Sequence, residues 1–179
     1  LGDSCSSYGN RNFWRVWSDW FGSTQYSTPL ISFKSHISYY GWTGLVHNKG
    51  ITGFTGQSKS MQAFSIDGDV AYSSYSEERG WQPTVYGGMQ SGTTELNRPI
   101  QAIKIQPTGS LASKYDIYYR VHVSYVGWMG WAKNGMPAGV TGGQGNNIEA
   151  IEIRLVNKGS NGPEESGQPF RDISSKEDP

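Results

Sequence analysis

Apolar and polar residues alternate along three stretches of the chain, at about residues 31–39, 70–75 and 117–125. Alternation with a period of two is typical of a β-strand that buries one face. The third stretch is the most regular, because every odd position from Ile117 to Tyr125 carries an apolar or aromatic side chain. In the first stretch, most odd positions from Ile31 to Tyr39 do the same. Each stretch therefore predicts a half-buried strand.

The same features follow each of these stretches. A Gly-Trp pair comes first, at Gly41-Trp42, Gly80-Trp81 and Gly127-Trp128. A glycine-rich run begins seven or eight residues later, at 50–56, 88–94 and 135–142. Each run leads to a second alternating segment, at 61–66, 100–105 and 148–153. The chain therefore contains three copies of one unit, which we place at residues 30–68, 70–106 and 115–156.

A repeat of this kind offers three or four short strands and cannot bury its apolar face alone. We therefore expect the three copies to close against one another. The sequence predicts an all-β domain with pseudo-threefold symmetry. A β-prism-like arrangement is preferred and a β-trefoil is the alternative, since the number of strands in each copy does not separate the two.

The second copy departs most from the other two. Pro83 stands where they have glycine, and because proline cannot donate to a β-ladder, we expect an edge or shortened strand there. Tyr75 stands where the other copies have His36 and His122. A short insertion, residues 107–113, separates the second copy from the third.

The two ends of the chain lack the repeat pattern. We interpret residues 1–29 as a linker remnant with an aromatic segment at 13–21, whose apolar positions follow helical spacing but also suit a strand. Two interpretations stay open for this segment: it covers an open end of the repeat core, or it forms an exposed aromatic binding strip. Residues 157–179 form a polar tail, which we expect to be disordered except for docking of Pro169-Phe170.

The composition narrows the possible functions. The 179 residues suit one domain with a sizeable core. Basic and acidic residues balance at 15 each, so no strong field favours nucleic acid or anionic lipid as a partner. The only cysteine, Cys5, excludes an intramolecular disulfide, and no apolar stretch approaches the ~20 residues of a membrane span. The 24 glycines and 24 aromatic residues (7 Trp, 11 Tyr, 6 Phe) suit short strands and tight turns.

No combination of residues indicates catalysis. His36 and His122 occupy equivalent positions, and because symmetry would not normally duplicate a nucleophile–base pair, we assign them to packing or hydrogen bonding. No His or Cys has metal-ligand spacing, and no glycine-rich run has the lysine and hydroxyl residue of a phosphate loop. Most acidic residues occupy solvent-facing strand positions or turns, which does not favour a carboxylate pair for glycoside hydrolysis. We therefore predict no enzyme activity, no metal and no cofactor.

Aromatic and amide side chains in the repeats favour carbohydrate binding instead. The apolar face of a sugar ring stacks on an aromatic face, and nearby Asn, Gln or acidic side chains then bond its hydroxyl groups. The candidate aromatic platforms are Trp131, Tyr86 and Tyr40. The candidate polar groups are Asn48, Gln57, Gln82, Glu95, Asn134, Gln144 and Asn146.

Two interpretations apply to the repeated tryptophans Trp42, Trp81 and Trp128. Three large side chains at symmetric positions could meet near the axis as core residues, or each could face a ligand in its own copy. Trp131 has no tryptophan counterpart in the other copies. We therefore expect Trp131 to be the more exposed residue and the better ligand contact.

The third copy carries the features of a known repeat. Its strand leads through Val121-His122-Val123 to Gly127-Trp128, and Gly135, the loop Gly139-Val140-Thr141-Gly142 and the closing segment 148–153 follow. In these features residues 30–156 resemble the clostridial hydrophobic repeat with conserved tryptophan, the ChW family. The second copy matches less well, with Tyr75 at the histidine position and Glu95 at the last loop glycine. The resemblance implies an extracellular, non-catalytic repeat module of secreted or surface proteins of Gram-positive bacteria, with polysaccharide or protein partners.

Two functional hypotheses follow. The first is a carbohydrate- or cell-wall-binding module that holds a secreted lysin, glycosidase or adhesin on its target through several weak, equivalent sites. The second is a protein-interaction or assembly module, in which the 13–21 segment and the strand edges contact another surface protein. Under both hypotheses we expect a secreted or cell-surface location.

Overall fold

The computed structural model describes residues 30–174, in which each repeat supplies five strands in the same order. The first repeat contains β1 (Ser32–Ile37), β2 (Gly41–Trp42), β3 (Val46–His47), β4 (Ile51–Gly53) and β5 (Met61–Asp67). The second contains β6 (Val70–Ser76), β7 (Gly80–Trp81), β8 (Val85–Tyr86), β9 (Gln90–Gly92) and β10 (Ala102–Pro107). The third contains β11 (Tyr115–Val123), β12 (Gly127–Trp128), β13 (Ala132–Lys133), β14 (Ala138–Thr141) and β15 (Ile148–Asn157). The repeat therefore has five strands rather than the three or four predicted.

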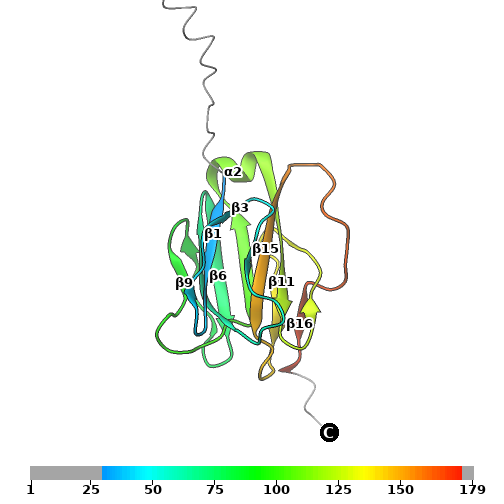
Figure 1. Cartoon of the computed structure of the whole chain (residues 1–179). Helices are drawn as coiled ribbons and strands as arrows, with labels where there is room; N and C mark the ends of the chain where they lie inside the picture. The colour runs from blue at the N-terminus through cyan, green and yellow to red at the C-terminus, as the bar shows by residue number, and fades with distance from the viewer. Residues whose placement is uncertain (1–29, 175–179) are drawn as a thin grey trace, which may run out of the picture.

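These strands form three sheets, and each sheet combines two neighbouring repeats. The first and last strands of a repeat pair with each other: β1 with β5, β6 with β10, and β11 with β15. The closing strand then takes the fourth strand of the following repeat: β9 joins β5, β14 joins β10, and β4 joins β15. The last of these pairs returns to the first repeat, so the strand exchange closes a ring. Figure 1 shows the long strands running along the length of the molecule.

Backbone hydrogen bonds attach each β-hairpin to the neighbouring repeat at equivalent positions. The Lys49 N–H donates to the carbonyl of Ile153 (2.9 Å), the Gly88 N–H to Ile66 (2.8 Å), and the Gly135 N–H to Ile105 (2.7 Å). All three bonds cross from one repeat to another. The same backbone bond therefore links the repeats at all three junctions.

A glycine in each donated strand allows the close approach of two repeats. Gly53, Gly92 and Gly139 have φ angles of 101°, 93° and 125°, a region that favours glycine. A Cβ atom on these residues would lie 2.2, 2.3 and 2.2 Å, respectively, from a backbone carbonyl oxygen of the neighbouring repeat. No side chain fits at that distance, so the exchange requires glycine at all three positions.

The inward faces of the sheets form one apolar core. Phe33, Tyr72 and Tyr119 occupy equivalent positions in it and are almost fully buried. The hydroxyl groups of Tyr72 and Tyr119 donate to the carbonyl oxygens of Met89 and Met136. Burial raises the pKa of both tyrosines, so both stay protonated donors. Other core residues are Ile31, Ile37, Met61, Phe64, Ile66, Ile103, Ile105, Ile117, Val121, Ile151 and Ile153.

The buried alternation ends earlier than the sequence predicts in two repeats. The last core residues of β1 and β11 are Ile37 and Val123. Tyr39 and Tyr125 lie in the turns that follow, at φ 61° and 64°, and both are 97% exposed. The chain must reverse here to pair the Gly-Trp strand with its own first strand, and such tight turns need positive φ. The prediction that these two tyrosines belong to the buried strand pattern is therefore wrong.

The second repeat keeps the same strand layout despite Pro83. β7 is an edge strand of its sheet, as Pro83 predicts. Its length of two residues equals that of β2 and β12, so it is not shortened relative to the other copies. Pro83 follows β7 and takes no place in a ladder.

The insertion at 107–113 contributes a short helix, α2 (Gly109–Lys114), which buries Leu111 and lies at one end of the molecule (Figure 1). Within residues 30–174, no helix is long and apolar enough to cross a membrane.

The polar tail docks on the third repeat through β16 (Phe170–Asp172), which pairs in parallel with β14. Phe170 lies opposite Gly139, so the predicted docking of Phe170 is confirmed. The disorder predicted for the rest of the tail is wrong as far as residue 174, because this stretch has a defined path along the third repeat. The aromatic segment at 13–21 and Cys5 lie outside the described residues.

The all-β fold class is confirmed. Three separate sheets joined by exchanged strands are the arrangement observed. The preference for a β-prism over a β-trefoil stays a prediction.

We expect Gly92→Ala to destabilise the domain by on the order of 3 kcal/mol, because its Cβ would meet a carbonyl oxygen at 2.3 Å and φ is 93°. Gly80→Ala is the matched control: φ is 68°, but the nearest atom to its Cβ would be 3.9 Å away. We expect about 1 kcal/mol there, from backbone strain alone. Urea unfolding measures both, and equal losses would contradict the close-approach account.

Candidate binding site

Each Gly-Trp tryptophan packs against a second ring on the outer face of its sheet. The strand registers place Trp42 opposite His36, Trp81 opposite Tyr75, and Trp128 opposite His122. The ring centroids are 5.5, 5.6 and 5.5 Å apart, with interplanar angles of 76°, 67° and 81°. We call each such pair, together with the cation described next, a tryptophan cluster.

A cation lies over the indole ring in every tryptophan cluster. The distances to the ring centroid are 5.0 Å from Lys34 to Trp42, 4.1 Å from Lys104 to Trp81, and 4.7 Å from Arg120 to Trp128. Lys34 and Arg120 occupy the same position on the first strand of their repeats. The second repeat has Ser73 there, and its cation comes from Lys104, which pairs directly with Ser73 across the ladder. A cation therefore lies over the indole ring in all three repeats, although it comes from the first strand in two of them and from the last strand in the second.

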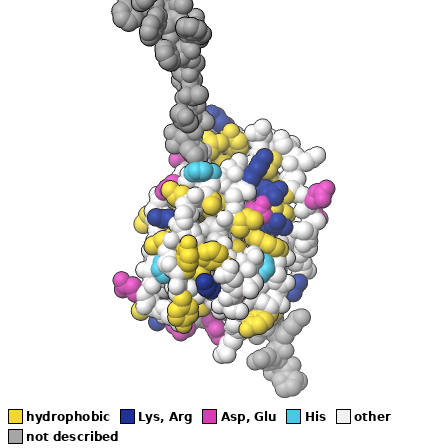
Figure 2. Space-filling model, viewed as in Figure 1, with side chains coloured by type: hydrophobic (Ala, Val, Ile, Leu, Met, Phe, Trp, Pro, Cys, Tyr) yellow, Lys and Arg dark blue, Asp and Glu magenta, His cyan; other side chains and the backbone are white. Residues whose placement is uncertain are grey.

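The tryptophan clusters face outward. Trp42 is 37% exposed, and Trp81 and Trp128 are half-buried. None of the three is a core residue, so the interpretation in which they meet near the axis is wrong. Phe33, Tyr72 and Tyr119 of the adjoining first strands belong to the core instead. The Gly-Trp strands β2, β7 and β12 are edge strands of their sheets. Figure 2 shows apolar side chains beside Lys or Arg side chains on the visible surface.

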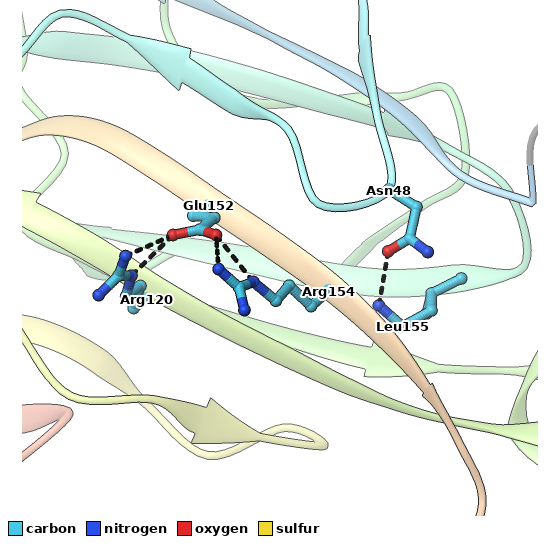
Figure 3. A network of polar contacts seen from close by, with 5 residues as sticks. All are labelled: Asn48, Arg120, Glu152, Arg154 and Leu155. Atoms are coloured by element: carbon cyan, nitrogen blue, oxygen red, sulfur yellow. Dashed lines mark hydrogen bonds and ion pairs between the residues drawn. The ribbon is translucent and has the colours of Figure 1, made fainter. Parts of the chain in front are cut away.

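In the third repeat a buried carboxylate, that of Glu152, extends the tryptophan cluster. Figure 3 shows it between Arg120 and Arg154. Glu152 accepts from the Arg120 Nε (2.7 Å) and from the Arg154 Nη2 (2.6 Å). Both guanidinium groups lie 4.8 Å from the centroid of Trp131, and Arg120 also lies over Trp128. Glu152 therefore fixes the two arginines that hold both indoles in place.

Trp131 is half-buried under these contacts. The expectation that it is more exposed than the Gly-Trp tryptophans is wrong for Trp42, which is the more exposed ring, since two cations pack on Trp131. Its role as a ligand contact stays a prediction.

Two of the predicted polar groups take structural partners. The Asn48 side-chain oxygen accepts from the Leu155 N–H at 2.8 Å, which links the first repeat to the third (Figure 3). The Asn134 side chain accepts from the Ile117 N–H at 2.9 Å and donates to Asp116 at 2.8 Å. The bond from Asn134, followed by that from Lys133, lowers the pKa of Asp116. These amides therefore stabilise turns, and their bonding oxygens are not free for a ligand.

The remaining predicted residues do not form one site. Tyr86 on β8 is 60% exposed, and Tyr40 is 56% exposed and packs edge-to-face on Phe54 at 4.7 Å. Gln82 is half-buried and donates to its own Gly80 carbonyl (3.2 Å). The other members are spread over loops of different repeats, with Gln57, Glu95 and Gln144 exposed and Asn146 half-buried. The structure thus separates the predicted set into several small surfaces.

The sequence reasoning missed the exposed rings of Tyr39 and Tyr125. Each lies two residues before the glycine of a Gly-Trp pair, where the chain turns. This position next to a turn was the sequence feature that could have indicated their exposure. Together with the adjacent Trp42 and Trp128, each adds an aromatic side chain at the end of a sheet.

The histidines hold structural positions. His36 Nδ1 lies 3.1 Å from Gln62 Oε1, and His122 Nδ1 lies 2.9 Å from Glu149 Oε2. The Ser124 hydroxyl donates to Glu149 rather than to the imidazole, so these residues do not form a nucleophile–base relay. Within residues 30–174, no three His, Cys, Asp or Glu side chains gather as a metal would require.

The ChW family model, Clostridial hydrophobic W, matches residues 76–109 and 122–157. These two segments are ChW repeats, and they fall in the second and third copies. The family model does not match the first copy, which we count as a third repeat because it has the same five strands and the same tryptophan cluster. No curated protein and no solved structure matches the chain. The match indicates a repeat module of a bacterial protein.

We expect Glu152→Gln to cost about 3 kcal/mol or more, because two arginines would lose the buried charge that pairs them. Glu78→Gln is the control: its carboxylate pairs with Arg98 but is 65% exposed, so we expect less than about 1 kcal/mol. Guanidinium-induced unfolding measures both. A similar small loss in the two variants would show that Glu152 does not organise the third cluster.

Proposed function

We propose that the chain is a non-catalytic carbohydrate- or cell-wall-binding module of a secreted or surface protein of a Gram-positive bacterium. The observation that supports this most directly is the outward tryptophan cluster on each of the three sheets. A cluster that served only to fill the core would be buried, and these are at least partly exposed.

The chemistry of the clusters suits a sugar. An exposed part of an indole gives the apolar face of a pyranose a surface to contact. The Lys or Arg over each ring offers N–H donors to the hydroxyl groups of the same sugar. The chain has 15 basic and 15 acidic residues, so it has no strong net electrostatic field to attract a partner. This balance fits a partner that is bound by local contacts of the kind described.

Three similar clusters also suit a polymer. Each would bind one unit weakly, and a polysaccharide that reaches more than one cluster would gain affinity from effective concentration. A module of this kind would hold a lysin, glycosidase or adhesin on the cell wall.

One observation favours a second candidate, a protein-interaction module. The outer edges of β4 and β9 carry no further strand within residues 30–174, whereas the equivalent edge of β14 pairs with β16. A strand from another protein could join these edges in the same way. Sedimentation velocity at rising concentration tests this: self-association or a complex with a surface protein would favour it, and a monomer that binds only glycan would exclude it.

For the binding module, we expect Trp42→Ala, Trp81→Ala and Trp128→Ala each to weaken binding to purified cell-wall polysaccharide about two- to tenfold. The triple variant should lose more than any single variant, because the clusters act together. Leu45→Ala is the control, since Leu45 is 54% exposed in the same β-hairpin as Trp42. Isothermal titration calorimetry gives the affinities.

Two outcomes would contradict this proposal. One is a folded wild-type protein that binds no wall polysaccharide. The other is a triple variant that binds as tightly as the wild type.

A further inference from the structure

A crevice opens in the second repeat, and Gln62 of the first repeat contributes to its lining. β9 with the following loop forms one wall, and β6 with the β7–β8 hairpin forms the other. Its volume of about 210 Å³ is on the scale of a single sugar ring. The apolar part of the lining consists of Pro83, Val85 and Ile100, and the rest is polar.

The equivalent space in the first repeat is closed by aromatic rings. Tyr40 and Phe54, which stand where the second repeat has Arg79 and Thr93, pack edge-to-face at 4.7 Å. Lys59, the counterpart of Arg98, lies over the Phe54 ring at 5.7 Å.

The first repeat also has a hydroxyl pair on the residues that correspond to Gln82 and Ser91 of the crevice. The Thr43 hydroxyl lies 2.9 Å from that of Thr52. Gln82 replaces Thr43 in the second repeat, and its amide turns away to the Gly80 carbonyl at 3.2 Å. The second repeat thus loses both the rings and one hydroxyl group from this space.

The equivalent space in the third repeat is filled by apolar side chains and covered by the tail. Met129 and Val140, which replace Gln82 and Thr93, are buried. The Gly130 N–H donates to the Gln168 carbonyl at 3.0 Å, which fixes the tail over this position. Of the three equivalent spaces, that of the second repeat is therefore the open one.

Polar groups in the open crevice lack partners. The hydroxyl of Thr93 and the Nη1 of Arg98 are buried and bond to nothing in the described part of the chain. The Arg98 Nε is held by Glu78 at 2.7 Å. Arg79, also in the lining, is exposed and belongs to none of the ion pairs within residues 30–174. The crevice lining therefore carries two guanidinium groups and no carboxylate, while Glu77 and Glu78 line a neighbouring hollow beside Arg98.

We infer that this crevice binds one sugar unit that carries a carboxylate. A buried guanidinium N–H without a partner calls for an acceptor, and a carboxylate suits the geometry and the charge of arginine best. The Thr93 hydroxyl would bond a sugar hydroxyl group, and Pro83, Val85 and Ile100 would meet the apolar ring face. This inference rests on the proposed function and adds one specific, acidic site to the three tryptophan clusters.

The test is an NMR titration of the ¹⁵N-labelled protein with glucuronic acid and, separately, with glucose. We expect glucuronate to shift the Thr93 amide and the Arg98 Nε–H, with glucose binding at least tenfold more weakly. Arg98→Gln should weaken glucuronate binding at least tenfold, and Lys59→Gln, at the equivalent position of the first repeat, should leave it unchanged. Should Arg98→Gln fail to fold, Thr93→Phe replaces it and should abolish binding by closing the crevice as Phe54 does.

Equal binding of glucose and glucuronate would overturn the acidic assignment. Glucuronate that shifts no crevice signal, or that binds Arg98→Gln as well as wild type, would overturn the site.

Titration of wall polysaccharide in the same samples separates the two proposals. If the polysaccharide shifts the tryptophan indoles while glucuronate leaves the crevice signals unmoved, the crevice inference fails alone. If glucuronate occupies the crevice and no polysaccharide binds, the acidic site stands and the wall-binding function fails.

Discussion

The fold depends on one close contact, repeated three times, in which a strand from one repeat lies against the closing strand of its neighbour. Gly53, Gly92 and Gly139 permit this contact, since any Cβ there would overlap a carbonyl oxygen. Without the donated strand, the closing strand of each sheet would have no partner on its outer side, and each repeat would expose its apolar face. Because the last exchange returns to the first repeat, the ring closes and no repeat is left without a neighbour at either end.

The same exchange explains how similar units acquire different surfaces. The core positions must match across the junctions, whereas the outer face and the crevice at each junction are free to vary. In the third repeat, Glu152 adds two arginines and Trp131 to the tryptophan cluster. In the second, Lys104 supplies the cation that Ser73 lacks, and the crevice opens. The repeats therefore share a scaffold and one ring geometry, and differ in the polar chemistry around it.

The repeat pattern was sufficient to predict the fold class but only part of the site. Period-two alternation and the repeated Gly-Trp pairs predicted the all-β class, and the ChW resemblance is confirmed for two copies. The outward placement of Trp42 did not follow from the sequence, because a tryptophan repeated at symmetric positions is most often a core residue. Contacts between strands determine the surroundings of these side chains. The strand register places Lys104 beside Ser73, and Asn48 bonds to Leu155, which lies 107 positions further along the chain. The first pairing depends on the register within one repeat and the second on the strand exchange, and no local pattern encodes either.

The central claim is that the outward tryptophan clusters are the binding surfaces of the module. The direct measurement is a ¹H–¹⁵N spectrum that resolves the indole N–H signals of Trp42, Trp81 and Trp128 during titration with purified Gram-positive cell-wall polysaccharide. The account predicts that these three signals move together with added polymer, while signals of the buried core residues Phe33 and Tyr119 stay in place. Binding that leaves all three indole signals unmoved would contradict it.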